Sequence, residues 1–496
     1  MTPIHFENSY ARLPERFYAR AHPEKAPQPE LIRVNEALAK EFNLDIAWLR
    51  SAEGIDMFSG SRLPESSEPI CMVYAGHQFG GLSPQLGDGR AHLIGELIDN
   101  EGVRSDAHLK GSGRTPFSRR GDGKAALGPV LREYIVSEAF AALGIPATRS
   151  LAAVLTGEHV MREGTVPGAV LTRMAQSHVR VGTFQYFAIR NDSEGGRLLA
   201  DYVIERHFPE LQQEENPYLA FFEAVALRQA RLIAQWMGVG FIHGVMNTDN
   251  MQVVGETIDF GPCAFMDRFL PDKVFSSIDA GGRYAWNRQS RMAKWNLARL
   301  AESLLPLINA DQAKAIAAAQ DVLGKFSDVF RNHYISIFSA KLGLAEAGGK
   351  QACNELFIEQ TLSLLAENEI DFTLFFRQLT RVAGGVGNGE EEGTLLALFT
   401  NADAASQWLA LWHQRWADRP DDREVGICLM KQSNPIYIPR NHKVEQVIEQ
   451  ANHGNFGPFH ELVDLLSRPF EEQPGFEDYE LPPEPHEEVQ ETFCGT

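Results

Sequence analysis

The sequence predicts a two-lobed α+β fold, in which a strand-rich N-terminal lobe is followed by a helical C-terminal lobe. At 496 residues, the chain is too long for one small core. Short apolar segments separated by glycine-rich stretches dominate the chain from Cys71 to about residue 200, which is typical of strands and turns. From Asp201 onward, apolar residues recur at helical spacing over long segments.

The strand-rich lobe is expected to hold several short strands and one main helix. The expected strands are Cys71–Tyr74, His92–Leu97, a segment ending at Lys110, Leu151–Leu155 and Ala169–Met174. The helix is expected over Pro129–Leu143, because apolar residues recur there at helical spacing and Gly144-Ile145-Pro146 then stops it.

The C-terminal lobe is expected to be built from long helices. These are Phe221–Trp236, Trp295–Ile308 and Ala313–Phe338, and Glu30–Phe42 near the N-terminus also has helical spacing. The segment Gly384–Gly393 predicts a flexible surface loop, because it is rich in glycine and glutamate. Beyond Phe470 the chain is rich in Pro, Glu and Asp, which predicts a poorly packed tail.

The net charge limits the classes of partner. The formal net charge is −20 and the isoelectric point is about 5.2. Nucleic acid is not expected as the main partner, because phosphate backbones require a basic face. No apolar run approaches the ~18 residues of a membrane span, and the N-terminus lacks a basic segment followed by an apolar one. We therefore expect a cytoplasmic protein that binds no membrane.

One stretch has the layout of a kinase catalytic loop followed by a metal-binding loop. Kinase catalytic loops read H-x-D-x-x-x-x-N, and D-F-G follows further on. Here His243 and Asn250 stand at the required separation, and Asp259-Phe260-Gly261 follows. Val245 occupies the position of the usual catalytic aspartate and cannot accept a proton. We expect a protein kinase-like bilobal fold that binds a metal–nucleotide without ordinary phosphoryl transfer.

Lys110 and Glu133 are the candidate ion pair of such a site. Lys110 ends an expected strand and Glu133 lies on the following helix. In kinases the lysine neutralises nucleotide phosphates and the glutamate fixes the lysine. Taken alone, both charges fit an exposed surface equally well. Lys110, Glu133, Asn250 and Asp259 follow one another in the chain as the corresponding residues do in kinases. This order favours a functional ion pair over two unrelated surface charges.

Asn250 and Asp259 offer oxygen ligands suited to Mg²⁺, which takes few protein ligands and completes its shell with phosphate oxygens. Asp249 is the remaining carboxylate in the loop and could take a proton from an incoming hydroxyl. The alternative is that Asp249 only caps the turn formed by Asn247, Thr248 and itself.

A glycine turn and a set of basic residues complete the candidate site. In Gly87-Asp88-Gly89-Arg90, small residues would let backbone N–H groups approach phosphates, although an ordinary hairpin turn is the alternative. Several cations suit a polyanion, because guanidinium groups bind phosphate oxygens in pairs. They are Arg119, Arg120, Lys124, Arg173 and Arg180.

These residues resemble the selenoprotein O family of pseudokinase-like protein adenylyltransferases. The motifs that carry the resemblance are Tyr74-Ala75-Gly76-His77-Gln78-Phe79-Gly80, Gln85-Leu86-Gly87-Asp88-Gly89-Arg90, His108-Leu109-Lys110-Gly111, Gly121-Asp122-Gly123, His243-Gly244-Val245-Met246-Asn247-Thr248-Asp249-Asn250-Met251, and Asn434-Pro435 with Pro439-Arg440-Asn441. They extend over nearly the whole chain.

The resemblance implies a kinase-like fold that binds ATP in a flipped orientation, with the γ-phosphate buried. AMP would then be transferred to Ser, Thr or Tyr hydroxyls of protein substrates, and pyrophosphate would leave. The implied ATP contacts are Gly87, Gly89, Arg90, Lys110, Asp122, Gly123, Arg173, Arg180 and Asp259, with Glu133 holding Lys110. Asn250 and Asp259 would hold Mg²⁺ or Mn²⁺, and Asp249 would accept the proton.

The expected organisation has five parts. They are an N-terminal extension (1–70), a kinase-like N-lobe with Lys110 and Glu133 (71–200), a kinase-like C-lobe with the catalytic and metal loops (201–340), a helical C-terminal extension (341–470) and an acidic, proline-rich tail (471–496).

Cysteine usage points to reduced thiols, because the five cysteines form no C-x-x-C pair and no zinc spacing. Some members of the resembled family carry selenocysteine near the C-terminus, where this chain has Cys494. The resemblance implies redox pairing of that residue with a cysteine after Asp-Phe-Gly, for which Cys263 is the nearest candidate.

Two other functions remain open at this point. One is an atypical phosphotransferase in which Asp249 replaces the missing base, since small-molecule kinases have a related loop. Val245 is the main argument against it. The other is a non-catalytic nucleotide-binding scaffold, which the presence of Lys110, Asn250 and Asp259 disfavours.

Overall fold

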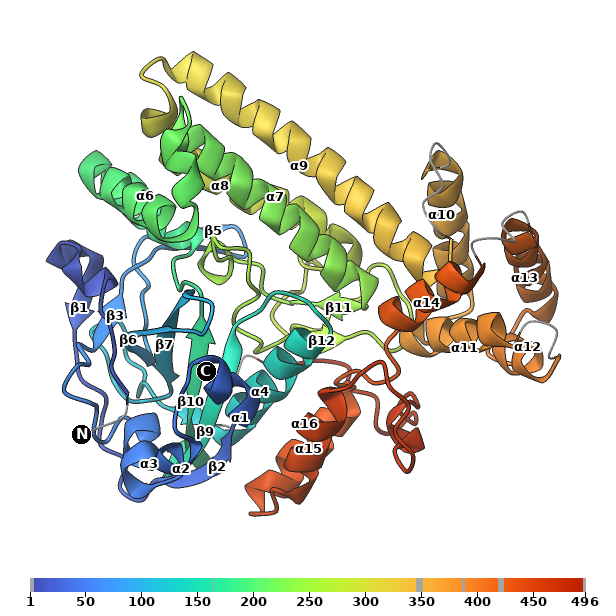
Figure 1. Ribbon diagram of the computed structural model, residues 1–496, viewed down its shortest axis with the longest axis horizontal. Helices are drawn as coiled ribbons and strands as arrows, with labels where there is room; N and C mark the ends of the chain where they lie inside the picture. Colours follow the sequence, from blue (N-terminus) through green and yellow to red (C-terminus); the bar gives the residue numbers. More distant parts are fainter. Residues whose placement is uncertain (1–3, 163, 345–350, 386–388, 418–422, 494–496) are drawn as a thin grey trace.

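An antiparallel sheet forms the centre of the N-terminal half. The computed structural model describes residues 4–162, 164–344, 351–385, 389–417 and 423–493 (Figure 1). The sheet has the order β1-β3-β6-β7-β10-β9-β2, and β8 also pairs with β10. Its strands are β1 (Tyr18–Arg20), β2 (Glu30–Val34), β3 (Ile70–Met72), β6 (Ala91–Ile98), β7 (Arg104–Lys110), β8 (Ala125–Ala126), β9 (Arg149–Met161) and β10 (Thr165–Ala175). All five expected strands therefore form. The first ends at Met72 instead of Tyr74, and the last two are longer than expected.

The helix expected over Glu30–Phe42 is wrong in its first half. Residues Glu30–Val34 form β2 and pair with β9, and only α1 (Glu36–Glu41) is helical. Asn35 separates the two, because its side chain accepts the Leu38 N–H at 3.1 Å and caps the helix. The β-branched Ile32 and Val34 before the cap suit a strand.

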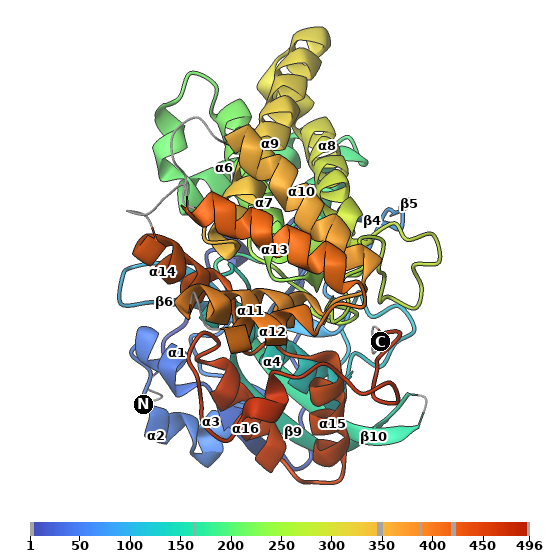
Figure 2. The ribbon, with the colours of Figure 1, turned by 90° about the vertical axis from the view of Figure 1, so that its right-hand side faces the viewer.

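Helix α4 (Leu127–Ala142) packs against the sheet and carries Glu133. It begins two residues before the expected start. Tyr134, Ile135 and Ala139 are buried in a core shared with α15 (Asn441–Asn452) and α16 (Gly457–Leu466). The C-terminal end of the chain thus returns to cover the helix of the N-terminal half, as Figure 2 shows.

The second half is helical, as expected. Helices α7 (Pro217–Gly238), α8 (Gln289–Ile308) and α9 (Gln312–Lys341) run side by side (Figure 1) and contain the three expected helices. Shorter helices α5 (Val181–Ala188) and α6 (Ser193–His207) connect them to the sheet. Within the described ranges, no helix combines the length and the hydropathy needed to cross a membrane.

Further helices follow α9. They are α10 (Gln351–Glu367), α11 (Phe372–Gly384), α12 (Gly389–Leu396), α13 (Ala402–Ala417) and α14 (Arg423–Ser433). The loop expected over Gly384–Gly393 is wrong at both ends, because Gly384 ends α11 and Gly389–Gly393 belong to α12. Glu390, Glu391 and Glu392 occupy the first turn of α12, where carboxylates stabilise a helix. Residues 386–388 of that expectation lie outside the described residues.

The expectation of a poorly packed tail holds for most of its described part, where Gln473, Glu480 and Thr492 alone are buried, but a few contacts hold the tail in place. Thr492 donates its hydroxyl to the Pro262 carbonyl at 2.6 Å, and its backbone N–H to the Phe275 carbonyl at 2.7 Å. The Glu480 carbonyl accepts a hydrogen bond from Arg440 at 2.7 Å. Composition gives no sign of these contacts, because they join the tail to residues distant in sequence. Phe476 and Tyr479 also pack against the core shared by α4, α15 and α16. Cys494 lies outside the described residues, and the Cys263 thiol is buried.

Arg440 connects three separate segments. It is 1% exposed and lies 2.7 Å from Asp267 and 2.9 Å from Asp371. Burial raises the pKa of Asp267 to about 6, although the attraction of Arg440 opposes this rise. The Pro439-Arg440-Asn441 motif therefore supplies the cation that compensates two buried carboxylates.

We predict that Arg440→Ala lowers the free energy of unfolding by roughly 3–5 kcal/mol, because it leaves two buried carboxylates without a cation. Urea unfolding of the whole chain measures this. The matched control is Arg468→Ala, since Arg468 is 60% exposed and pairs with Glu471 at 3.5 Å. The control should cost less than about 1 kcal/mol. Equal losses in the two variants would contradict the role of Arg440.

Candidate active site

The candidate site lies where the sheet meets the loops that follow α7. Lys110 ends β7, and its Nζ lies 2.5 Å from Glu133 Oε2 on α4 and 2.9 Å from Asp259 Oδ1. Arg173 on β10 reaches the same two carboxylates, at 3.1 Å and 3.0 Å. Two cations from neighbouring strands thus bridge a helix carboxylate and a loop carboxylate.

Asp259 is held as an anion by this arrangement. Burial alone would raise the pKa of Asp259, but the attraction of Lys110, Arg173 and Arg180 outweighs it and lowers the pKa well below its usual range. The backbone of Asp259 has a φ of +62°, which a non-glycine residue rarely adopts. Such strain is found where the surrounding structure fixes a functional side chain.

Arg180 is the second buried arginine of the site. It is 3% exposed, and its guanidinium carbon lies 4.3 Å from the centroid of the Tyr74 ring. Its guanidinium also lies 3.8 Å from Asp88 of the glycine turn. Because Arg180 directly precedes α5, the start of that helix and the glycine turn together fix its position.

Asp88 also orients Arg173, through His108. His108 Nε2 lies 3.3 Å from Asp88 Oδ2, and His108 Nδ1 lies 3.0 Å from Arg173 Nη2. A guanidinium only donates, so Nδ1 accepts and the proton of a neutral imidazole is on Nε2. Burial lowers the pKa of His108, which favours this neutral form. Asp88 is therefore the common anchor of both arginines. Asp88 lies between Gly87 and Gly89 in the predicted glycine turn, but was not among the predicted site residues.

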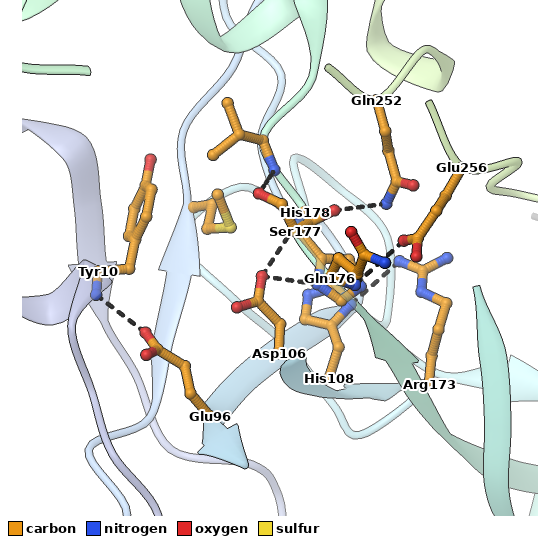
Figure 3. Close-up of polar contacts among 12 residues, drawn as sticks. Tyr10, Glu96, Asp106, His108, Arg173, Gln176, Ser177, His178, Gln252 and Glu256 are labelled. Carbon is orange, nitrogen blue, oxygen red and sulfur yellow. Dashed lines mark hydrogen bonds and ion pairs between the residues drawn. The ribbon is translucent and has the colours of Figure 1, made fainter. Parts of the chain in front are cut away.

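A network behind this anchor fixes the segment that leads to Arg180 (Figure 3). Asp106 Oδ2 accepts a hydrogen bond from the His178 backbone N–H at 2.8 Å. The same oxygen lies 3.1 Å from Nδ1 of the His178 ring. Gln252 donates to the Ser177 carbonyl at 2.7 Å, and Glu256 accepts the Gln176 N–H at 3.1 Å. Burial raises the pKa of Glu256 to about 8.

The glycine turn is packed under the loop that follows β7. Gly87 has a φ of +119°, and a Cβ at this position would lie 2.6 Å from the Phe117 ring. Thr115 donates its hydroxyl to the Asp88 carbonyl at 2.6 Å. A Cβ on Gly89 would approach the Phe117 carbonyl to 3.0 Å. Both glycines are therefore required by close packing within the protein.

The remaining predicted ATP contacts lie around that same loop. Arg90 directly precedes β6, and its carbonyl accepts the Gly111 N–H at 2.7 Å. Asp122 faces Arg162 at 2.9 Å and accepts the Lys124 N–H at 3.0 Å. Gly123 has a φ of +71° and lies against the Gly113 backbone. The structure brings Lys110, Glu133, Arg173 and Asp259 together, whereas Asp122 contacts Arg162 instead of this cluster.

The loop around Val245 holds the other candidate residues. His243 is fully buried, and its Nε2 lies 2.8 Å from the Ile258 carbonyl, so it supports the backbone next to Asp259. Asn250 donates its side-chain NH₂ to the Val245 carbonyl at 3.0 Å, which leaves its side-chain oxygen as a possible ligand. Val245 thus contributes to the site only through its backbone.

Asp249 is covered by a hairpin that the Tyr74–Gly80 motif begins. The hairpin consists of β4 (Gly76–Gln78) and β5 (Gly81–Ser83). Gln78 Nε2 donates to Asp249 Oδ2 at 3.1 Å, and a Cβ on Gly76 would lie 2.3 Å from Asp249 Oδ1. Burial raises the pKa of Asp249 to about 6. Only glycine at position 76 lets the hairpin pack this closely on the carboxylate.

The donor set fits a magnesium-type ion. No group of three or more His, Cys, Asp or Glu side chains able to hold a metal occurs among the described residues. An amide oxygen of Asn250 and a carboxylate of Asp259 are the oxygen donors that Mg²⁺ uses together with substrate phosphates.

Buried cations gathered around an ionised aspartate, with oxygen ligands for Mg²⁺ nearby in the sequence, suit an enzyme that binds phosphate groups. Comparison with known proteins agrees. Residues 1–467 match the family model described as Protein adenylyltransferase SelO, and the chain therefore belongs to this family. This confirms the family predicted from the sequence motifs.

Similar proteins extend over almost the entire chain. One from Rhodopseudomonas palustris (strain BisB5), described as Protein nucleotidyltransferase YdiU, is 56% identical over 492 residues, covering 99% of each chain. Another of the same description, from Nitrobacter hamburgensis, is 55% identical over 496 residues, covering 100% of this chain and 97% of the relative. The chain is thus a nucleotidyltransferase, and its family's adenylyl transfer implies ATP as substrate.

We predict that Asp88→Asn weakens ATP binding on the order of tenfold, because one charged anchor of two arginines is lost. Isothermal titration of ATP measures this. Asp99→Asn is the control, since Asp99 only caps a turn by accepting the Val103 N–H at 2.8 Å. His108→Phe keeps a ring beside His178 but removes both nitrogens, and should weaken ATP binding in the same direction. Unchanged affinity in both site variants would contradict the anchoring role.

Proposed function

We propose that this nucleotidyltransferase transfers AMP from ATP to Ser, Thr or Tyr hydroxyls of proteins and releases pyrophosphate. The observation that carries the proposal is the pair of buried arginines, Arg173 and Arg180, beside Lys110 and Asp259. Arg173 is 2% exposed and Arg180 is 3% exposed. Cations so deep in the protein suit the terminal phosphates of a nucleotide that enters with its phosphate tail inward.

In this proposal the fold is kinase-like and has two lobes, with the N-lobe over 71–200 and the C-lobe over 201–340. The N-terminal extension (1–70), the helical extension (341–470) and the tail (471–496) surround them. The ion pair between Lys110 on β7 and Glu133 on α4 supports this assignment, because kinases join a strand lysine to a helix glutamate in the same way.

The flipped nucleotide would make two sets of contacts. The β- and γ-phosphates would meet Lys110, Arg173 and Arg180, so that the α-phosphate faces the acceptor. The glycine turn with Gly87, Gly89 and Arg90, and the loop with Asp122 and Gly123, would complete the ATP contacts. Mg²⁺ or Mn²⁺ would be held by Asn250 and Asp259, and would neutralise phosphate charge.

Asp249 is the proposed proton acceptor. The acceptor oxygen would form a bond to the α-phosphorus while the bond from that phosphorus to the bridging oxygen breaks, and pyrophosphate leaves. The hydroxyl proton passes to Asp249. Both carboxylate oxygens of Asp249 lie against the β4–β5 hairpin, so an acceptor reaches Asp249 only when this hairpin moves aside.

ATP labelled at the α- or the γ-phosphate tests the transfer directly. Each is incubated with the purified protein, Mg²⁺ and a mixed protein substrate. We expect α-label on protein and none in Asp259→Ala, because AMP transfer retains only the α-phosphate. γ-Label on protein would instead establish a phosphotransferase. Absence of both labels, with ATP still bound, would favour a scaffold.

Asp249→Asn separates catalysis from binding. We predict that kcat falls roughly 10²- to 10⁴-fold, because the general base is lost. The Kd for ATP should change less than threefold or so, because Asp249 is not among the proposed ATP contacts. Asp45→Asn is the control, since Asp45 Oδ1 accepts two backbone N–H groups, from Ala47 and Trp48, in the N-terminal extension. A wild-type rate in Asp249→Asn would refute the assignment of the base.

A further inference from the structure

A patch of arginine and aromatic side chains borders the hairpin that covers Asp249. We call Arg283, Trp295 and Arg299 the arginine–tryptophan patch. The guanidinium carbons of Arg283 and Arg299 lie 4.8 Å and 4.9 Å from the centroid of the Trp295 ring. Both arginines are only partly exposed. Stacking on the indole restrains both guanidinium groups and leaves their N–H edges available.

The charge of this patch is not balanced locally. Among the residues that the structure describes, Arg283 forms no ion pair with a carboxylate, and Arg299 pairs only with Glu302, which is 55% exposed. Asp279 uses its two carboxylate oxygens on the backbone N–H groups of Arg283 and Tyr284, at 2.8 Å each. In a chain with 66 acidic and 46 basic residues, an unbalanced cation beside the candidate site requires an explanation.

The patch is joined to the candidate base by a short chain of contacts. The Tyr284 hydroxyl donates to Asn247 Oδ1 at 2.7 Å, and the Phe79 N–H donates to the same oxygen at 3.1 Å. Asn247 lies two residues before Asp249 in the sequence. A Cβ on Gly80, at the hairpin tip, would lie 3.6 Å from Arg283 Nη1. The hairpin tip therefore lies between the arginine–tryptophan patch and Asp249.

Exposed apolar side chains lie on the hairpin and on the segment that precedes Arg283. Leu82 on β5 is 45% exposed, and Ile278 in the segment before Arg283 is 63% exposed. Large exposed apolar residues beside an unbalanced cation are typical of surfaces that contact another protein.

We propose that the arginine–tryptophan patch binds a carboxylate side chain of the protein substrate close to the acceptor hydroxyl, so that the enzyme prefers acceptors in acidic segments. The inference rests on the proposed function and names the class of its substrate. A carboxylate is the expected partner because it accepts two parallel N–H bonds from one guanidinium. A neighbouring residue of an extended peptide lies ~3.3 Å further along the chain, so a few residues span from acceptor to patch.

Three peptides with a single serine test the proposal. They carry Asp, Ala or Lys at all positions within four residues of the serine, and transfer from α-labelled ATP gives kcat/KM for each. The Asp peptide should exceed the Ala peptide about fivefold, and the Lys peptide should be the poorest, as for a partly exposed ion pair. Arg283→Glu should reverse the order of the Asp and Lys peptides. Its ATP affinity should match that of wild type, because Arg283 is not among the proposed ATP contacts.

Two further variants keep the result interpretable. Arg283→Gln preserves the size of the side chain and should abolish the preference without reversing it. Arg423→Glu on α14 changes the net charge equally at an exposed position and should keep the wild-type preference. Equal labelling of all three peptides by the wild-type enzyme would overturn the docking proposal and leave AMP transfer intact. If ATP binds but no peptide takes α-label, the proposed function fails, and this inference with it.

Discussion

The structure of the site depends on the interaction of Asp259 with two cations. Lys110 and Arg173 come from neighbouring strands of the sheet, and both also contact Glu133 on α4. Asp259 comes from the loop after α7, so this cluster joins the strand-rich half to the helical half. Such charges are costly to bury unless each is paired. The cluster therefore fixes the two halves in the one arrangement that pairs all four groups.

Around this cluster, further buried side chains fix the positions of Arg173 and Arg180. Asp88 fixes Arg180 directly and Arg173 through His108, and the network around Asp106 fixes the segment before Arg180. The result is a buried centre in which three cations, Lys110, Arg173 and Arg180, stand among three carboxylates, Glu133, Asp259 and Asp88. Guanidinium and ammonium groups can bind phosphate oxygens, and the adenylyl transfer of the family to which the chain belongs implies ATP as substrate. The hairpin over Asp249 then separates this centre from the surface where a protein substrate would arrive.

Much of the fold was predictable because it follows from local patterns. Apolar spacing located α4, α7, α8 and α9, and motif order brought Lys110, Glu133, Asn250 and Asp259 into one hypothesis. The errors have common physical causes. The single helix expected over Glu30–Phe42 is interrupted at Asn35, which caps α1 after β2 has ended. The tail was expected to be loose, but Arg440, which is distant in sequence, binds its Glu480 carbonyl. Asp88 and Gln78 occur in the quoted motifs, but no role was predicted for them, because their importance comes from side chains that only the fold brings near. A linear motif gives no indication of such contacts.

The central claim is that the phosphate tail of ATP points into the buried arginines and leaves the α-phosphorus beside Asp249. A crystal structure of the protein with Mn²⁺ and an ATP analogue that resists cleavage between the α- and β-phosphates tests it most directly. The account predicts that the γ-phosphate contacts Arg173 and Arg180, and that the α-phosphorus is the phosphorus nearest to Asp249. A γ-phosphorus nearest to Asp249, with the α-phosphate on the arginines, would contradict it.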